Sequence, residues 1–185
     1  MRRLAPLMLV SSALGAPGSP AVHGVEPAGV QRGTAFSLTL TGERLQGARQ
    51  VLLYDPGLTV TGVANTNDTT VVVTGTATPE CATGEHRLRL VTAGGVSELR
   101  TVWVGAWPVV AEVEPNGDLA SAQKVPLNCT VSGVVTREDA DYYAVEVKAG
   151  ERITAGHEKR RNSRRLGSAG PSTCQVETLV VEAPR

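Results

Sequence analysis

The sequence predicts an all-β protein. Hydrophobic and polar residues alternate in short runs, β-branched residues fill these runs, and Gly and Pro separate them. No stretch shows the 3.6-residue hydrophobic stripe that is typical of an amphipathic helix. Turn residues recur at roughly every 8–12 positions, as in small β-sandwiches. Residues 25–104 therefore predict a small β-sandwich.

The predicted strands of a first module, residues 22–106, follow in order. In AFSLTLTG the residues Phe36, Leu38 and Leu40 alternate with small polar residues, which indicates a strand with one buried face. QVLLYDPG ends in a Pro-Gly turn, and LTVTGV and TTVVVTGTA are rich in β-branched residues. Residues 85–105 predict a hairpin with Gly94-Gly95 at its bend.

A second module is expected at residues 107–155, after a boundary marked by Pro108 and Pro115. TVSGVV, DYYAVEVKAG and ERITA predict three strands, with Tyr143, Val145 and Val147 on one face. Three strands leave an apolar face and two edges uncovered, so we expect this second sandwich to be incomplete.

Residues 156–185 change in character. Strand alternation stops, and the net charge is +3, whereas residues 22–155 carry ten Lys and Arg against fifteen Asp and Glu. We expect a disordered basic tail, and a change of reading frame would explain it; VETLVVEA could add an edge strand. The acidic body and the lack of aromatics in KRRNSRR argue against a nucleic-acid partner.

The N-terminus has the pattern of a secretion signal. Arg2 and Arg3 precede an apolar stretch too short to span a bilayer, and Ser19 and Ala21 fit the −3 and −1 positions of a cleavage site. We therefore expect residues 1–21 to be removed and the protein to be secreted, to the periplasm or beyond the cell. No later stretch is expected to be a transmembrane segment.

The motifs of common enzymes are missing from the sequence, which contains no GxSxG, HExxH or P-loop. The three cysteines form no CxxC pair, so Cys81 and Cys129 are either a disulfide between modules or two buried free thiols. His86 is expected in a strand rather than as a base. We predict that the chain is not an enzyme.

Two acidic stretches are the main candidates for chemistry. If EVEPNGD is extended, the side-chain oxygens of its alternate residues share one face, and the acids of the 138–141 turn could complete a calcium site. A solvated acidic linker is the alternative. The candidate ligands are Glu112, Glu114, Asn116, Asp118, Asp139 and Asp141.

Two family resemblances sharpen these expectations. Gly33-Thr34 followed by LTLTG resembles the opening of TIG/IPT immunoglobulin-like modules, over about residues 23–105. E-P-N at 114–116, G-x-V, D-x-D-Y-Y at 139–143 and V-x-x-G-E resemble the first half of a bacterial pre-peptidase C-terminal (PPC) domain. The TIG/IPT resemblance implies an Ig-like β-sandwich, and the PPC resemblance implies an incomplete jelly-roll-like β-sandwich after it.

The PPC resemblance also implies a secreted accessory domain that in some relatives binds calcium through E-x-E-x-N and a downstream acidic turn. Those relatives carry an acid directly after the Asn, where this chain has Gly117 and then Asp118. The resulting hypothesis is a secreted, non-catalytic binding or spacer module, a fragment of a larger exported protein, with an extracellular protein or polysaccharide as partner. The alternative is an accessory fragment of a secreted peptidase or other hydrolase whose catalytic part is missing.

Overall fold

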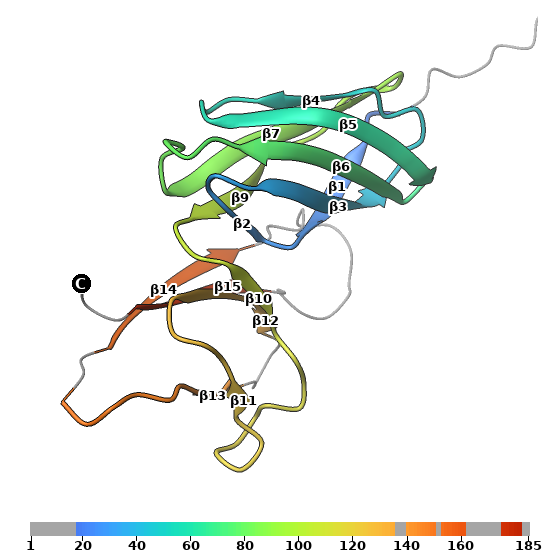
Figure 1. The fold of residues 1–185 in the computed structure, drawn as a ribbon. Coiled ribbons are helices and arrows are strands. Elements are labelled where there is room, and N and C mark those ends of the chain that lie inside the picture. The colour runs from blue at the N-terminus through green and yellow to red at the C-terminus, as the bar shows by residue number, and fades with distance from the viewer. Residues whose placement is uncertain (1–17, 136–139, 151–152, 162–174, 183–185) are drawn as a thin grey trace, which may run out of the picture.

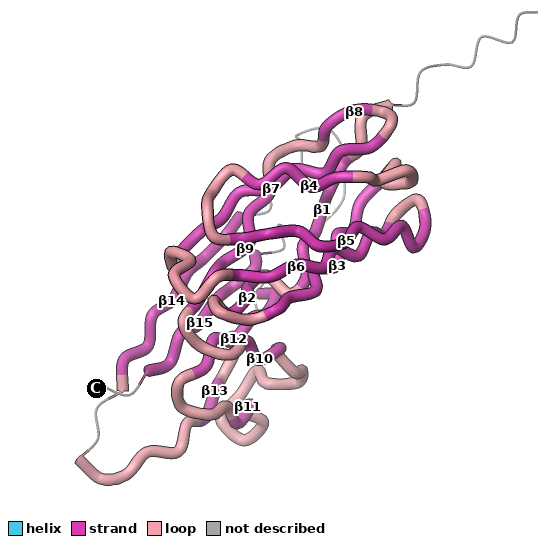
Figure 2. Tube along the Cα trace, turned by 45° about the horizontal axis from the view of Figure 1, so that its top comes forward, coloured by secondary structure: helices cyan, strands magenta, loops and turns pink. Residues whose placement is uncertain are grey.

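The computed structural model describes residues 18–135, 140–150, 153–161 and 175–182. Every regular element in these ranges is a β-strand (Figure 2), which confirms the all-β prediction. In the part of the chain that the structure describes, no helix is long and apolar enough to cross a membrane.

The first sandwich consists of two sheets formed by strands β1–β9 (Figure 1). One sheet is antiparallel, in the order β1 (Ala21–Glu26), β3 (Ala35–Glu43), β6 (Thr70–Ala77) and β5 (Leu58–Asn67). The other has the order β2 (Gly29–Gln31), β9 (Arg100–Gly105), β7 (Gly84–Thr92) and β4 (Gln50–Leu53), and β8 (Gly95–Val96) pairs with β7. Only β2 and β9 run parallel in this sandwich.

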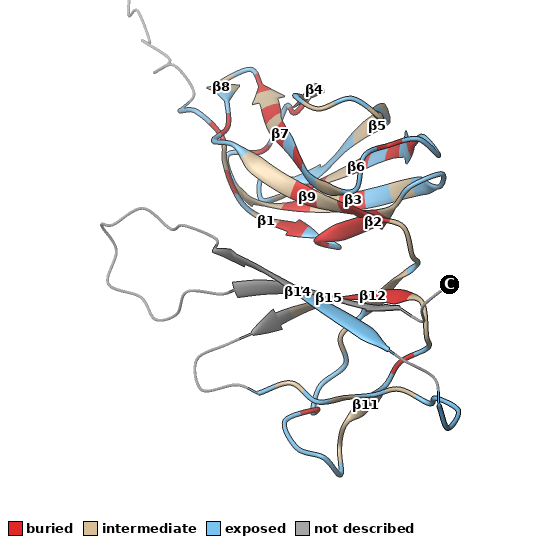
Figure 3. Cartoon of the chain, turned by 90° about the vertical axis from the view of Figure 1, so that its left-hand side faces the viewer, coloured by how far each residue is buried: buried red, intermediate tan, exposed pale blue. Residues whose placement is uncertain are grey.

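Both sheets turn their apolar faces toward each other (Figure 3). Leu40 of β3 and Val71 of β6 are fully buried, and Leu90 of β7 and Val104 of β9 meet them from the opposite sheet. Alternation along β3 follows the prediction, because Leu38 and Leu40 are buried while their neighbours are not. The hydrophobic period of two residues therefore fixes which face of each strand forms the core.

The predicted hairpin at residues 85–105 is confirmed, with its bend one residue earlier than expected. Thr92 pairs with Gly95, so Ala93 and Gly94 form the two-residue turn between β7 and β8. Gly95 has a φ of +132°, a conformation that L side chains rarely adopt. Strand β9 continues along the same edge of β7, and β4 pairs with the other edge.

The second module comprises strands β10–β15. Four of them form a sheet in the order β10 (Val109–Ala111), β12 (Cys129–Val135), β15 (Gln175–Glu182) and β14 (Thr154–Arg161). A separate parallel pair joins β11 (Gln123–Lys124) and β13 (Tyr143–Ala144). Of the predicted face, Tyr143 and Val145 pack against the buried residues Val125, Cys129 and Val131, whereas Val147 is 46% exposed.

The C-terminal region differs from the disordered tail that the sequence predicts. Strand β14 extends to Arg161, and β15 lies between β12 and β14 as an inner strand rather than at an edge. The pairing of β15 with both neighbours satisfies the backbone groups that an incomplete sheet would leave open. The polar composition of residues 156–185 predicted disorder, because composition carries no information about pairing with distant strands. Residues 162–174 lie outside the described residues.

The two modules touch through a short junction. The amide of Ala28 in the first sandwich donates a hydrogen bond to Ser132 Oγ in β12 at 3.2 Å. The predicted alternative of a disulfide between the modules is wrong: Cys81 and Cys129 are free, buried thiols in separate cores. Cys174 lies outside the described residues.

Candidate metal centre

The first acidic stretch leaves the second sheet directly after β10. Its start is fixed by the amide of Glu112, which donates to the Ser132 carbonyl of β12 at 3.0 Å. The side chain of Gln123 then holds the backbone on both sides, because it accepts from the amide of Val113 at 2.9 Å and donates to the carbonyl of Ala111 at 2.9 Å. The Gln123 side chain thus makes two backbone hydrogen bonds of the kind that a neighbouring strand would make along this segment.

The second acidic stretch is brought alongside by backbone hydrogen bonds. The amide of Tyr142 donates to the carbonyl of Asn116 at 2.9 Å, and the amide of Gln123 donates to the carbonyl of Tyr142 at 2.9 Å. Strands β11 and β13 continue this contact in parallel. Residues far apart in the sequence therefore meet at one place.

Three carboxylates form an acidic cluster at this place: Glu112, Glu114 and Asp141. One oxygen of each lies within 4.8 Å of the others. Glu112 and Asp141 are half-buried, and Glu114 is exposed. Like charges at such separations repel, and reduced access to water strengthens the repulsion. A bound cation would reverse the sign of this interaction.

Asn116 supplies a fourth oxygen beside the cluster. The residue is 0% exposed, and its Nδ2 donates to Glu112 Oε1 at 3.1 Å. Its Oδ1 is buried and has no hydrogen-bond partner among the described residues. Leaving a buried amide oxygen unsatisfied costs about 1–3 kcal/mol. This oxygen is therefore able to accept a hydrogen bond from water or to coordinate a cation.

Glu112 is held in place by contacts that the sequence analysis did not identify. The hydroxyl of Tyr143 donates to Glu112 Oε1 at 2.7 Å. The same carboxylate lies over Gly133 of β12, where a Cβ would overlap its oxygens. Gly133 begins the G-x-V motif, and Tyr143 belongs to the D-Y-Y motif. The sequence shows both motifs, but only the fold shows that both residues lie against the Glu112 carboxylate.

Two predicted ligands are not part of the acidic cluster. Oδ1 of Asp118 accepts hydrogen bonds from the amides of Ala120 and Ser121 at 2.8 Å each, and these bonds lower the pKa of the carboxyl, with Ser121 contributing most. Asp118 therefore stabilises its own turn. Asp139 lies outside the described residues. The expected face of alternate oxygens is thus reduced to Glu112, Glu114 and Asn116, joined by Asp141.

Cys81 and His86 resemble a nucleophile and a base only by proximity. Their Sγ and Nε2 atoms are 3.7 Å apart, yet Nε2 also lies 2.7 Å from the Ala82 carbonyl. An acceptor at that distance requires Nε2 to carry the proton, so it cannot take one from the thiol. Burial raises the pKa of Cys81, which disfavours the reactive thiolate. This pair is arranged for packing.

No protein-family model and no curated protein matches the chain. One similar solved structure is the SGBP-B protein of the Bacteroides ovatus mixed-linkage glucan utilization locus, in complex with a mixed-linkage heptasaccharide. It is 17% identical with a TM-score of 0.37, over 86% of this chain and 35% of that one.

A second similar structure is the endo-fucoidan hydrolase MfFcnA4 of glycoside hydrolase family 107. It is 13% identical with a TM-score of 0.26, over 90% of this chain and 25% of that one. The chain therefore spans about a third or less of the length of these two proteins.

Proposed function

We propose that the chain is a non-catalytic β-sandwich binding or spacer unit of a larger exported protein, and that its second module binds calcium. The observation that carries this proposal is the acidic cluster together with the buried, unsatisfied Oδ1 of Asn116. Calcium takes six to eight oxygen ligands from carboxylates, amide carbonyls and water. The cluster offers oxygen alone, which disfavours zinc and other metals that prefer nitrogen or sulfur.

Calcium would tie together two segments of the second module that lie far apart in the sequence. Glu112 and Glu114 follow β10, whereas Asp141 precedes β13. An ion bound between them stabilises the folded module by RT ln(1 + [Ca²⁺]/Kd), because the unfolded chain does not present the ligands together. The ion thus has a structural role in this proposal and takes part in no reaction.

Calorimetric titration of the full chain with calcium tests this proposal. Glu114→Gln removes one charge at an exposed position while keeping an acceptor for the amide of Asn116, which donates to Glu114 Oε2 at 2.9 Å. We expect this variant to bind calcium at least about tenfold more weakly, a loss of about 1.4 kcal/mol. Asp118→Asn is the matched control and is expected to keep the wild-type affinity. Absence of calcium binding by the wild type would contradict the proposal.

Export is supported by the basic and apolar segment at the N-terminus, which is followed by small residues. The acidic surface also disfavours nucleic acid as a partner. We propose an extracellular or periplasmic location on this basis. Fractionation of cells expressing the full chain tests it, and accumulation in the cytosol with Met1 retained would contradict it.

A polysaccharide is the proposed partner class, because two of the few aromatic residues lie on the outer face of the β2-β9-β7-β4 sheet. Tyr54 is 50% exposed, and Trp103 lies between the inward-facing Val102 and Val104 of β9. Between them Arg87 is fixed by Asp55, with bonds of 2.7 and 3.1 Å to its two oxygens. Aromatic faces and fixed polar groups are typical of sites for small ligands.

Affinity electrophoresis through gels that contain soluble polysaccharides tests this face. We expect Tyr54→Ala to abolish any retardation that the wild type shows. Thr74→Ala, at an exposed position on the opposite sheet, is the matched control and is expected to migrate like the wild type. Wild-type migration that no polysaccharide retards would contradict the partner class and leave the spacer function.

A further inference from the structure

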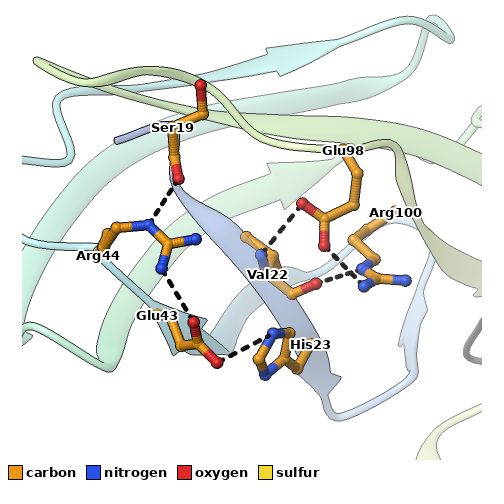
Figure 4. Close-up of polar contacts among 7 residues, drawn as sticks. All are labelled: Ser19, Val22, His23, Glu43, Arg44, Glu98 and Arg100. Atoms are coloured by element: carbon orange, nitrogen blue, oxygen red, sulfur yellow. Dashed lines mark hydrogen bonds and ion pairs between the residues drawn. The ribbon is translucent and has the colours of Figure 1, made fainter. Parts of the chain in front are cut away.

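The chain just before and within the start of β1 is anchored by side chains of the first sandwich (Figure 4). Arg44 Nε donates to the carbonyl of Ser19 at 2.9 Å, and Arg100 Nε donates to the carbonyl of Val22 at 2.6 Å. The amide of Val22 donates to Glu98 Oε2 at 3.3 Å, and the other oxygen of Glu98 pairs with Arg100 at 2.7 Å.

Two glycines of the first sandwich lie against the residues before Val22. Strand β1 begins with Ala21, which pairs with Glu43 in β3. A Cβ on Gly42 would overlap the carbonyl of Ala21, so glycine at this position allows the close approach of that backbone. A Cβ on Gly95 would lie 3.2 Å from Ser19 Oγ, which places Ser19 against the β7–β8 turn.

Cleavage between Ala21 and Val22 would remove these contacts. Hydrolysis adds water across the peptide bond and leaves a carboxylate on Ala21 and an ammonium on Val22. Val22 is 0% exposed, so the new charge would be buried, where desolvation is costly. Glu98 would have to neutralise this ammonium while it remains paired with Arg100. The carbonyl that Arg44 binds would also be lost.

We propose that the mature protein retains Ser19, Pro20 and Ala21, and that the leader is removed on the amino-terminal side of Ser19. The proposal rests on the export proposed above. Two upstream bonds carry small residues at the −3 and −1 positions that signal processing requires. These pairs are Ala13 with Gly15, and Ala16 with Gly18.

Intact mass spectrometry of the exported protein tests the position of the bond. The full chain is expressed with its own leader in an exporting bacterium, and the extracytoplasmic fraction is analysed. We expect a mature chain that begins at Ala16 or Ser19. A chain that begins at Val22 would overturn the inference while leaving export intact. A chain that retains Met1 would overturn both the inference and the export on which it rests.

A stability cycle tests the physical reason independently. Chains that begin at Ser19 and at Val22 are compared, each with Arg44 and with Arg44→Ala. We expect the Val22 chain to melt about 4–8 °C below the Ser19 chain. Arg44→Ala should lower the Tm of the Ser19 chain and leave that of the Val22 chain nearly unchanged. Equal melting temperatures for the two starting points would contradict the inference.

Discussion

The two modules are stabilised by different means. Among the described side chains, the core of the first sandwich contains 17 buried apolar residues, whereas that of the second module contains Val125, Cys129 and Val131. The second module instead concentrates buried or half-buried polar groups around Glu112. Among the described side chains, apolar burial thus dominates in the first sandwich, whereas the polar groups around Glu112 are the part of the chain that a bound cation would stabilise most.

Truncation of the first core should have the largest effect. Leu90 is 0% exposed between the two sheets, so Leu90→Ala leaves a cavity and is expected to lower the free energy of unfolding by about 2–5 kcal/mol. Urea denaturation followed by circular dichroism measures this loss. The same loss is expected with calcium and with chelator. A loss that differs between these two conditions would contradict the expectation that calcium stabilises only the second module.

Removal of calcium should have the next largest effect, confined to the second module. At a free calcium concentration of about 100 Kd, linkage contributes about 2.7 kcal/mol, which chelation removes. Calorimetric melting with calcium and with chelator measures this change. Glu112→Gln should abolish the difference, because Glu112 is the carboxylate that Asn116 and Tyr143 hold in place. An equal response in the wild type and the variant would argue against the acidic cluster as the site.

A surface pair gives a smaller, pH-dependent effect in the first sandwich. Hydrogen bonds from the Arg87 side chain and amide lower the pKa of Asp55 from 3.8 to about 2. Since the folded-state pKa lies below that of the unfolded chain, the ionised carboxylate stabilises the fold above about pH 3.8, and this contribution disappears as the pH falls toward 2. Asp55→Asn should reduce the change of the urea midpoint with pH between these two values. Asp68→Asn is the control and is expected to show the same change of midpoint with pH as the wild type.

The sequence predicted the first sandwich well because its signal is local. Each strand carries its own alternation, as in β3, where Leu38 and Leu40 identify the buried face. The inner position of β15 was not predicted, because it depends on pairing with strands tens of residues away. A polar composition does not exclude a strand that two neighbours hydrogen-bond along its length.

The candidate site was predicted in part for a similar reason. Residue type and spacing identified Glu112, Glu114, Asn116 and Asp141, which the fold brings together. Spacing could not show that Asp118 accepts hydrogen bonds from its own turn, nor that Gln123 substitutes for a strand partner. These features depend on the direction of each side chain. The two-residue alternation of hydrophobic and polar residues determines that direction only within regular strands.

Amide hydrogen exchange with and without calcium tests the central claim most directly, because it follows both modules in one sample. We expect calcium to slow exchange at least about tenfold at residues 112–116 and 141–144, which corresponds to about 1.4 kcal/mol of local stabilisation. Exchange in β3, β6, β7 and β9 is expected to be the same in both conditions. Slowing that is equal in both modules, or absent from the segments around the acidic cluster, would contradict the account.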